Sequence, residues 1–526
     1  MKYRESFAEK IEKSLAELAA ENALPFVSAM VTGLAAYFYC FANKLEIMDD
    51  LACMFYHGDS VSSGRWGLDL SSRFLPGYSM PWLNGILSIL FISAAVCIIL
   101  KMFRIKSRLL NILLPAVIIS FPSQICTFAY MFAAPHYAFS LLLAVLSAKC
   151  ISKAAGTETA AGKPVLERKQ AIAAVLLLVG SLSIYQAYAA VSASLLIVFA
   201  FQQTLSKKNR ANEILIKGAV YVALLAAAMA LYYLITAIVK KTTGTEFNQY
   251  AENNLNNFAE ALFGLRVAYT AFLGYFTRGY YDLILPGASR WANVGLILVS
   301  ALAAAVYFIR GEKNREKTGR IWVAALCIVL LPAGINCMRI ISSTFHNLML
   351  FGFVSVYVLA AVIFENCMDS GKFRLSAPAK DLAALCLAVI AAVNINFANS
   401  VYLKMDIQFK QAQSFYTGML ARLSEDPEFN ENSIICIVGD NDGLYPISNI
   451  DTDDLSGIRE GIIGVYSQRA FVKYFCGYDL KIADTDITDA LEEDQRVIDM
   501  PQYPFAGSVQ KIDGRFVIKV GNIVNE

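Results

Sequence analysis

The chain of 526 residues is 57% hydrophobic and only 17% charged, with a mean hydropathy of +0.49 and a net charge of +2. Soluble domains carry about 25% charged residues, so this composition excludes an ordinary soluble protein and predicts one that resides in a lipid bilayer. The near-neutral balance gives no reason to expect a nucleic-acid partner.

The first segment, residues 1–23, carries charges of both signs and precedes the first long apolar run. Its apolar residues Phe7, Ile11, Leu15 and Leu18 recur at the spacing of one helix face. We therefore expect an amphipathic helix that lies on the cytoplasmic surface of the membrane.

Apolar runs long enough to cross about 30 Å of hydrocarbon recur between residues 24 and 401. They predict a mainly α-helical, polytopic membrane domain over 24–401, with about eleven transmembrane helices. The stretch 261–285 is semi-apolar but interrupted by charges, so we interpret it as an interfacial or re-entrant helix. The predicted spans are 24–43, 81–102, 109–128, 132–149, 171–187, 188–206, 214–239, 291–309, 321–337, 345–364 and 381–401.

Lysine and arginine are concentrated in every second connection between these spans. Cytoplasmic loops carry an excess of both residues, which predicts a cytoplasmic N-terminus and an extracytoplasmic C-terminal tail. The basic connections lie at 101–108, 153–169, 207–210, 310–320 and 372–380.

The tail, residues 402–526, is patterned as a small extracytoplasmic α/β domain rather than as further spans. Cys436 and Cys476 would be able to pair there outside the cell, and the sequence leaves this open. The predicted elements are a helix continuing from the last span at 404–424, buried strands at 433–438 and 515–520, and an acidic helix at 485–496.

Several common catalytic signatures are absent from the sequence. There is no phosphate-binding glycine loop, dinucleotide fingerprint, zinc-protease helix or nucleophile elbow. The three histidines, His57, His136 and His346, lie in three separate segments. We therefore expect no metal site built from histidine.

The strongest candidates are two adjacent acids, Asp49 and Asp50, that open the outer loop 44–80 directly after the first span. Partial desolvation raises the pKa of a carboxylate and suits it to take a proton from a hydroxyl. Arg65 in the same loop can bind a phosphate through two parallel hydrogen bonds, and Trp66 offers an apolar face to a sugar ring. The loop thus suits a sugar linked to a lipid phosphate. The alternative is that these residues only mark the membrane–water interface, with the charges in water and the tryptophan in the aromatic belt.

Further candidates fall on the same predicted outer side. Arg339 and Arg278 are candidates for binding a donor phosphate, whereas His136, Tyr185 and Gln186 are candidates for contacting substrate. Each has a structural alternative: an arginine can reach the surface along its own side chain, and the others can pack or form hydrogen bonds between helices.

Three stretches resemble the GtrII-type glucosyltransferases of bacteria. They are IMDDLACMFYHGDSVSSGRWGLDL at 47–70, the proline-led second span that begins Pro81-Trp82, and SLSIYQAY at 181–188. The resemblance covers most of the membrane region and implies a GT-C-like fold. It also implies a bacterial plasma (inner) membrane enzyme that inverts the sugar as it transfers it, glucose first, from a polyprenyl-phosphate donor. The acceptor would be O-antigen, another cell-surface glycan or a lipid-linked glycan, on the outer face.

In this resemblance an acid of the first outer loop serves as the base, a role that matches Asp49 or Asp50. Neighbours on a helix point about 100° apart, so we favour Asp50 as the base and give Asp49 a supporting role. Arg65 and Trp66 match the GR-type motif of that loop. A donor synthase and a donor flippase are implied partners. No cofactor is required, although the acid pair could recruit a divalent cation such as Mg²⁺ or Mn²⁺.

Two other classes of protein stay open at this point. A transporter or flippase of lipid-linked sugar or polymer would also need many spans, but it predicts internal repeats and charges near the bilayer midplane. A non-catalytic assembly or receptor protein predicts nothing special about the acid pair.

Overall fold

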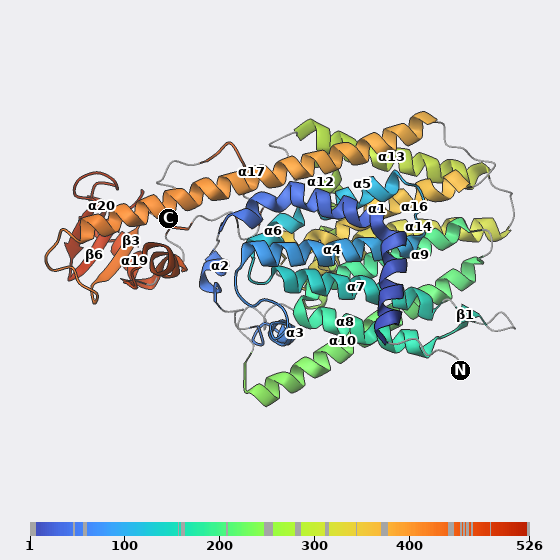
Figure 1. Ribbon diagram of the computed structural model, residues 1–526, viewed down its shortest axis with the longest axis horizontal. Helices are drawn as coiled ribbons and strands as arrows, with labels where there is room; N and C mark the ends of the chain where they lie inside the picture. Colours follow the sequence, from blue (N-terminus) through green and yellow to red (C-terminus); the bar gives the residue numbers. More distant parts are fainter. Residues whose placement is uncertain are drawn as a thin grey trace.

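The computed structural model describes residues 7–45, 48–55, 60–155, 157–158, 164–206, 209–246, 256–278, 286–310, 315–342, 345–369, 377–439, 447–452, 455, 458, 462–463, 466–483 and 485–522. Long helices run side by side along the long axis of the molecule, and a small sheet domain projects from one end of this bundle (Figure 1).

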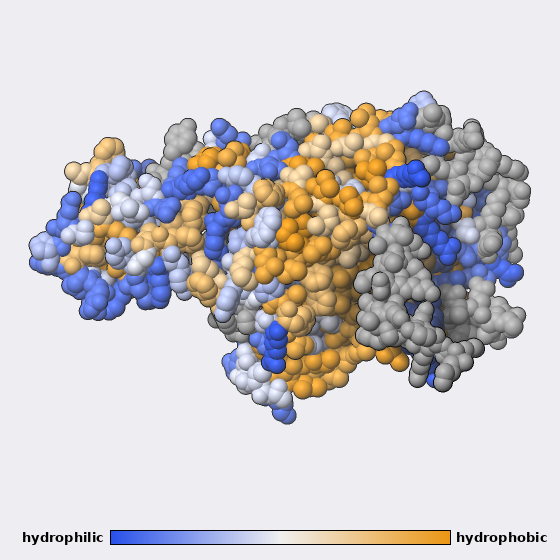
Figure 2. All heavy atoms as spheres, viewed as in Figure 1, coloured by the Kyte–Doolittle hydropathy of each residue, from blue (hydrophilic) through white to orange (hydrophobic). Residues whose placement is uncertain are grey.

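Within these ranges, nine helices are long and apolar enough to cross a membrane, or ten if one bent pair counts as a span. Apolar residues gather over the middle of the bundle, and hydrophilic residues gather over the sheet domain (Figure 2). The chain is therefore a polytopic helical membrane protein, as predicted. The candidate spans lie in α1 (Phe7–Ala42), α4 (Pro81–Phe103), α7 (Ala134–Ala154), η1 with α9 (Gln186–Tyr188 and Ala189–Leu205), α10 (Ala211–Thr243), α13 (Pro286–Arg310), α14 (Arg315–Ile335), η2 with α16 (Asn347–Phe353 and Val354–Asp369) and α17 (Ala377–Leu423).

The candidates in the described residues number nine or ten where about eleven were predicted, because two predicted spans fall short of a single long helix. The span at 109–128 is broken into α5 (Leu110–Ile119) and α6 (Ser123–Ala129), which meet at 48°. Pro122 lies in the break, where it lacks the N–H that would continue the helix. The span at 171–187 is α8 (Arg168–Ile184), whose 17 residues rise only about 26 Å.

The stretch 261–285, predicted not to span, falls mainly in α12 (Phe258–Arg278), and α12 is not among the nine candidates. Residues 279–285 lie outside the described ranges. α12 packs closely on the short α15 (Cys337–Ile341): a β-carbon at Gly264 would lie 2.3 Å from the Arg339 carbonyl oxygen.

The first helix, α1, changes direction along its length. Its first part crosses the bundle steeply, whereas its second part runs along α4 and α5 (Figure 1). Pro25 lies inside the helix and removes one of its backbone hydrogen bonds, which is the usual cause of a kink. The predicted helix at 1–23 is thus helical from Phe7, and its position on the cytoplasmic surface stays a prediction.

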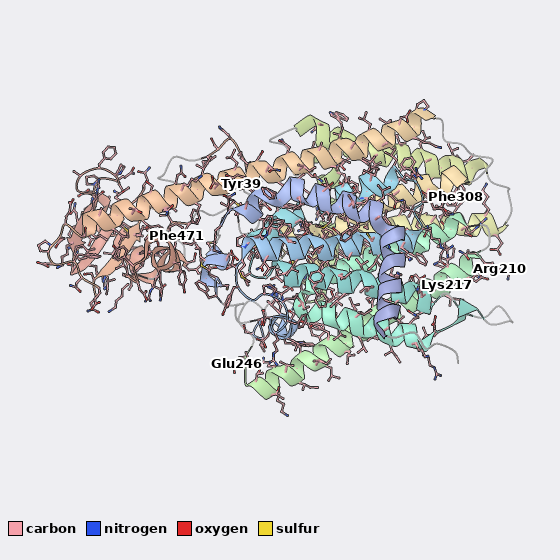
Figure 3. The ribbon with its side chains drawn as sticks, in the orientation of Figure 1. Tyr39, Arg210, Lys217, Glu246, Phe308 and Phe471 are labelled. Atoms are coloured by element: carbon pink, nitrogen blue, oxygen red, sulfur yellow. The ribbon has the colours of Figure 1, made fainter. Side chains whose placement is uncertain are left out.

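The longest helix, α17, joins the bundle to the sheet domain. Its 47 residues extend about 70 Å, so it passes unbroken through residue 402, the predicted domain boundary. Asp406 fixes it to the end of α1 by accepting a hydrogen bond from the Tyr39 hydroxyl at 3.0 Å, and Lys410 pairs with the same carboxylate at 2.6 Å. Tyr39 lies where the two helices meet (Figure 3).

The C-terminal domain contains a four-stranded sheet in the order β4-β3-β6-β5. The central strands pair in parallel, and β5 and β6 form a hairpin closed by Asp513 and Gly514, both at positive φ. The predicted strands at 433–438 and 515–520 are confirmed as β3 and β6, whereas the predicted helix 485–496 is split in two. The elements are β3 (Ile434–Val438), β4 (Lys481–Ile482), β5 (Val509–Ile512), β6 (Arg515–Lys519), α18 (Gln468–Phe471), η4 (Val472–Cys476), α19 (Thr485–Glu492) and α20 (Gln495–Ile498).

Helices cover both faces of this sheet because side chains alternate along its strands. Ile435 and Ile437 pack with the end of α17, whereas Cys436 packs with α19 and α20 on the opposite face. Cys476 packs on the α17 face, so the sheet separates it from Cys436. Both cysteines are free, and the disulfide that the sequence left open does not form.

The sheet domain and the helices of the first loop, α2 (Met48–Ala52) and α3 (Trp66–Ser71), lie at one end of the bundle (Figure 1). The hairpin of β1 (Thr157–Glu158) and β2 (Pro164–Val165) lies at the other end, as does the basic residue Arg210 (Figure 3). The polar first loop and the predicted extracytoplasmic tail thus share one end of the bundle.

Candidate active site

The acid pair lies on α2, but its two members face different surroundings. Asp50 is 1% exposed and accepts hydrogen bonds from Ser79 Oγ at 2.6 Å and from the Phe132 backbone N–H at 2.9 Å. Lys44 donates to the carbonyl oxygen of the same serine at 2.9 Å. Asp50 therefore joins α2 to the segment before α4 and to the turn before α7, and both of its carboxylate oxygens are engaged.

Asp49 is half-buried, and its carboxylate acts electrostatically on Tyr130, which follows the end of α6, and on Tyr137 in the first turn of α7. Burial, and then the Asp49 carboxylate, raise the pKa of Tyr130, whereas Arg65 lowers it. The carboxylate and the guanidinium thus act on the same tyrosine with opposite sign. Burial, followed by Asp49 and Asp50, also raises the pKa of Cys53 to about 12, so this thiol stays protonated.

Two glycines fix the position of Arg65. Gly64 has φ +76°, the left-handed conformation that only glycine adopts without strain. A β-carbon at Gly67 would lie 2.0 Å from the Ser183 hydroxyl and 2.9 Å from its carbonyl carbon. The sequence Gly-Arg-Trp-Gly therefore makes a sharp turn and seats α3 directly on α8.

Gln186 and Tyr232 hold the turn from the opposite side. The Gln186 amide donates to the Ser63 carbonyl at 3.2 Å and to the Tyr232 hydroxyl at 2.9 Å, and Tyr232 donates to the Gly64 carbonyl at 3.0 Å. Gln186, predicted to bind substrate, thus contacts the residues just before Arg65. Its contact with substrate stays a prediction.

The guanidinium of Arg65 is held against two stacked tyrosines. Its Nη1 donates to the Tyr137 hydroxyl at 3.2 Å, and the group lies 5.5 Å from the centre of the Tyr185 ring. Tyr137 and Tyr185 stack with centroids 4.5 Å apart. Tyr185, another predicted site residue, interrupts the helix between α8 and η1 in an extended conformation, and its buried hydroxyl has no hydrogen-bond partner in the described residues.

Trp66 and His136 both make contacts within the protein. The Trp66 indole donates to Thr236 of α10 at 3.1 Å. His136 is fully buried, with Nδ1 2.7 Å from Ser71 Oγ and Nε2 3.0 Å from the Pro76 carbonyl. These contacts fix α3 to α10 and to α7, and the predicted contact of either residue with substrate is not tested by them.

Arg339 lies on α15, and its guanidinium stacks 3.6 Å from the centre of the Phe345 ring. His346 follows Phe345 in the chain. Burial, and then the nearby Arg65 guanidinium, lower the pKa of His346. The connection between α14 and η2 thus comes near Arg65. The side chain of Arg278 lies outside the described residues.

The sheet domain also contributes to this end of the bundle. Leu51 and Met54, on either side of the end of α2, pack into the core between α17 and the sheet. The Tyr466 hydroxyl donates to the Asp49 carboxylate. Asp49 therefore lies at a seam between the bundle and the C-terminal domain.

A segment of the sheet domain also returns to the bundle. Lys404 on α17 donates to the Ile450 carbonyl at 2.8 Å and to Thr452 Oγ1 at 3.0 Å. Leu455 and Ile458 are buried in the apolar core of the bundle. The sheet domain is therefore anchored on both sides of Asp49.

Sequence reasoning missed Tyr137 and Tyr466. Tyr137 directly follows His136, and neighbouring helix residues point about 100° apart, so the sequence had no means of choosing between them. Tyr466 is 417 positions from Asp49 along the chain, and no motif marks it.

In the described part of the chain, no three His, Cys, Asp or Glu side chains gather as a metal site would require. Asp50 directs both oxygens at protein donors, so the acid pair does not present two carboxylates to one cation. The divalent ion that the sequence left open therefore stays a prediction, since Glu46, His57 and Asp59 of the same loop lie outside the described residues.

A comparison with known families gives one match. A family model described as Glucosyl transferase GtrII matches residues 38–363, more than half of the chain, and leaves the whole of α17 and the whole C-terminal sheet outside the match. No curated protein matches the chain, and no solved structure matches it. The chain belongs to the GtrII glucosyltransferase family and is a membrane-embedded glycosyltransferase.

Proposed function

We propose that this protein transfers glucose from a polyprenyl-phosphate donor to a hydroxyl of a cell-surface glycan or lipid-linked acceptor, with inversion at the sugar. The observation that carries the proposal is that Arg65 binds the Tyr137 hydroxyl and that Asp49 and Arg65 both act on Tyr130 and Tyr137, at one end of a membrane bundle. A base and an anion-binding group at the membrane surface are what a lipid-phosphate donor requires. We propose a GT-C-like arrangement for the bundle on the same grounds.

Asp49 is the base in this proposal, in place of the Asp50 that the sequence favoured. Both oxygens of Asp50 accept short hydrogen bonds inside the protein, and a carboxylate so held is poorly placed to reach an acceptor. Asp49 is half-buried and already accepts from a phenol hydroxyl, a donor of the same kind as a sugar hydroxyl. Asp50 then positions α2.

Arg65 binds the donor phosphate in this proposal. Tyr137 and Tyr185 hold its guanidinium in one orientation, which preserves a planar fork for two phosphate oxygens. Arg339 is a second phosphate-binding candidate because its connection also reaches this cluster through His346. Arg278 stays a third phosphate-binding candidate, on the basis of its position in the sequence alone.

The reaction is a single displacement. The acceptor hydroxyl gives its proton to Asp49 as its oxygen bonds to the anomeric carbon, and the bond from that carbon to the phosphate oxygen breaks. Arg65 stabilises the charge that develops on the departing phosphate. Attack opposite the leaving group inverts the configuration.

The lipid chain of the donor needs an apolar surface at membrane depth. A cavity of about 420 Å³ between α12, α13, α14 and α16 offers one, with a lining that is almost wholly apolar. Phe272, Leu296, Ile328 and Val356 are among its lining residues. We propose that part of the polyprenyl chain lies here.

The charge distribution supports the orientation. The basic connections predict the cytoplasmic side, and the site lies with the sheet domain at the opposite end. We therefore place the N-terminus in the cytoplasm and the site on the outer face of the bacterial plasma membrane. A donor synthase and a donor flippase of the same pathway would then supply the substrate.

The test is a transfer assay in liposomes with labelled polyprenyl-phosphate-glucose and a panel of glycan acceptors. We compare the wild type with Asp49→Asn and Asp50→Asn at matched expression, each with and without EDTA. Asp49→Asn should lower turnover by about 10²- to 10⁴-fold, the usual contribution of a general base. Asp50→Asn should mainly lower the melting temperature.

Unchanged turnover in Asp49→Asn would remove the proposed base. Loss of turnover in Asp50→Asn alone, at normal stability, would restore the assignment favoured by the sequence. No consumption of any polyprenyl-phosphate sugar by the wild type, with movement of the intact donor across the bilayer, would favour a flippase.

A further inference from the structure

Four aromatic side chains lie exposed around the seam where the bundle meets the sheet domain. Phe55 and Tyr78 come from the first loop, and Tyr466 and Tyr474 come from the sheet domain. We call this set the aromatic seam. Its member Tyr466 donates to Asp49, which connects the seam to the proposed active site.

Three of the four rings pack edge to face. The Phe55 ring lies 5.9 Å from Tyr78 at 77° and 5.1 Å from Tyr474 at 73°. The exposed fractions are 57% for Phe55, 55% for Tyr78, 46% for Tyr474 and 65% for Tyr466. Edge-to-face packing leaves ring faces open to a ligand.

The surroundings of the seam indicate water rather than hydrocarbon. Tyr474 lies on η4 beside Lys473. Asp479, which follows η4, pairs with Lys473 at 2.8 Å and with Arg469 of α18 at 2.9 Å, and these three charged side chains are exposed. On the neighbouring α18, Phe471 is directed into the core of the sheet domain (Figure 3). Aromatic rings set among surface ion pairs on a water-facing domain differ from an aromatic belt, which surrounds the spans themselves.

We propose that the aromatic seam binds the acceptor glycan. This inference rests on the proposed function, in which Asp49 takes a proton from an acceptor hydroxyl. The apolar C–H faces of sugar rings stack on open aromatic faces, and hydroxyls bind the neighbouring charges. The Tyr466 hydroxyl, which donates to Asp49, occupies the place of the acceptor hydroxyl and gives way to it.

The proposal assigns acceptor choice to the sheet domain. Tyr466 and Tyr474 both lie outside residues 38–363, the range matched by the family model. Chains that share the matched region can therefore differ in acceptor through the sheet-domain half of the seam.

The experiment is photo-crosslinking in intact membranes with the full chain. A photoreactive phenylalanine analogue replaces Tyr474, Tyr78 or, as a control, Phe505, which is 69% exposed on the sheet domain but lies outside the seam. Illumination should give a sugar-positive adduct at least 5-fold stronger at Tyr474 and Tyr78 than at Phe505. The readout needs no catalysis, and it works with an acceptor whose structure has not been identified.

Equal adducts at the three positions, no sugar-positive adduct, or adducts with phospholipid alone would overturn the proposal; the last would mark the seam as a membrane contact. The outcome is separable from that of Asp49→Asn. An inactive Asp49→Asn protein without seam adducts would sink only this inference, whereas seam adducts with an active Asp49→Asn protein would sink only the assigned base.

A second measurement tests Tyr466 directly with the donor alone as probe. Tyr466→Phe removes the hydrogen bond to Asp49 and leaves the ring. Water can then reach the carboxylate, so hydrolysis of polyprenyl-phosphate-glucose without acceptor should rise by about 2- to 10-fold. Hydrolysis at the wild-type rate would contradict the role of this hydroxyl.

Discussion

Two groups of side chains near Asp49 are built differently; we call them the bundle wall and the sheet wall. The bundle wall, formed by Arg65, Tyr137 and Tyr185, is buried or half-buried, and neighbouring helices hold each side chain in place. The sheet wall, formed by Tyr466 and Tyr474, is exposed and set among surface charges. The bundle wall lies inside the range matched by the family model, and the sheet wall lies outside it.

The difference matches two different demands. A group that stabilises charge in a transition state must be oriented before the reaction, and buried hydrogen bonds achieve this. A surface that selects among glycans needs open faces and residues that can be changed without loss of the fold. Changes to the bundle wall should therefore affect turnover or stability, whereas changes to the sheet wall should affect the choice of acceptor.

The largest expected effect is that of Arg65. Arg65→Gln should lower kcat by at least about 10²-fold, because the charge on the departing phosphate loses its main partner. Arg65→Lys should recover little, since an ammonium cannot reproduce the planar fork that Tyr137 and Tyr185 orient. Kinetics with labelled polyprenyl-phosphate-glucose measures both variants.

The matched control is Arg496→Gln on the sheet domain, where an exposed arginine pairs with Asp494 and Asp513. It should leave kcat within about 2-fold of the wild type, because an exposed ion pair contributes little. An Arg65→Lys protein with wild-type kcat would show that the bundle wall does not depend on an oriented guanidinium.

The next effect is on stability. Gly67→Ala places a β-carbon within 2.0 Å of the Ser183 hydroxyl and 2.9 Å of its carbonyl carbon, so α3 must move away from α8. We expect a cost of about 1–3 kcal/mol, seen as a lower melting temperature in detergent. Gly218→Ala in α10 is the matched control, because nothing lies within 4 Å of its β-carbon. Equal melting of the two variants would contradict the close seating of α3.

The helical bundle and the sheet domain also differ in how far the sequence could predict their structure. Apolar runs located the spans because burial in lipid demands a fixed length, and charge asymmetry placed the first loop and the tail at the same end. The run at 109–128 did not reveal its break, because hydropathy averages over Pro122. The strands at 434–438 and 515–519 were predictable from local pattern, but their direct pairing was not.

For the candidate site, the sequence selected segments that the structure brings to one end of the bundle, and it could not go further. It identified Asp49, Asp50 and Arg65 but could not decide which acid is held inside the protein, because that depends on Ser79 and Phe132 from elsewhere in the chain. It could not bring Tyr466 to Asp49, since such a contact follows from how the sheet domain docks.

A smaller effect concerns pH. Burial, and then Arg65, lower the pKa of His346 below its usual value of 6.5, so the folded protein keeps this imidazole neutral. The unfolded chain takes up the proton first as the pH falls below about 6.5, and stability then decreases until the folded-state pKa is passed. Between pH 7.5 and 5.5, the wild type should lose about 1–2 °C more in melting temperature than His346→Gln. Parallel pH profiles would show that His346 does not titrate in this window.

The smallest expected effect reports the charge of Asp49 without any catalysis. Burial, and then Asp49 and Asp50, raise the pKa of Cys53 to about 12, so little reactive thiolate forms at pH 8. Asp49→Asn removes one nearby negative charge and should speed alkylation of Cys53 by iodoacetamide about 2- to 5-fold, measured by peptide mass spectrometry. Cys476, half-buried in the sheet domain, is the internal reference, because burial rather than Asp49 raises its pKa. A parallel rise in the alkylation rate of Cys476 would indicate a loosened fold. A rise confined to Cys53 would show that the Asp49 carboxylate carries its charge close to this thiol, at the place where the proposed reaction needs it.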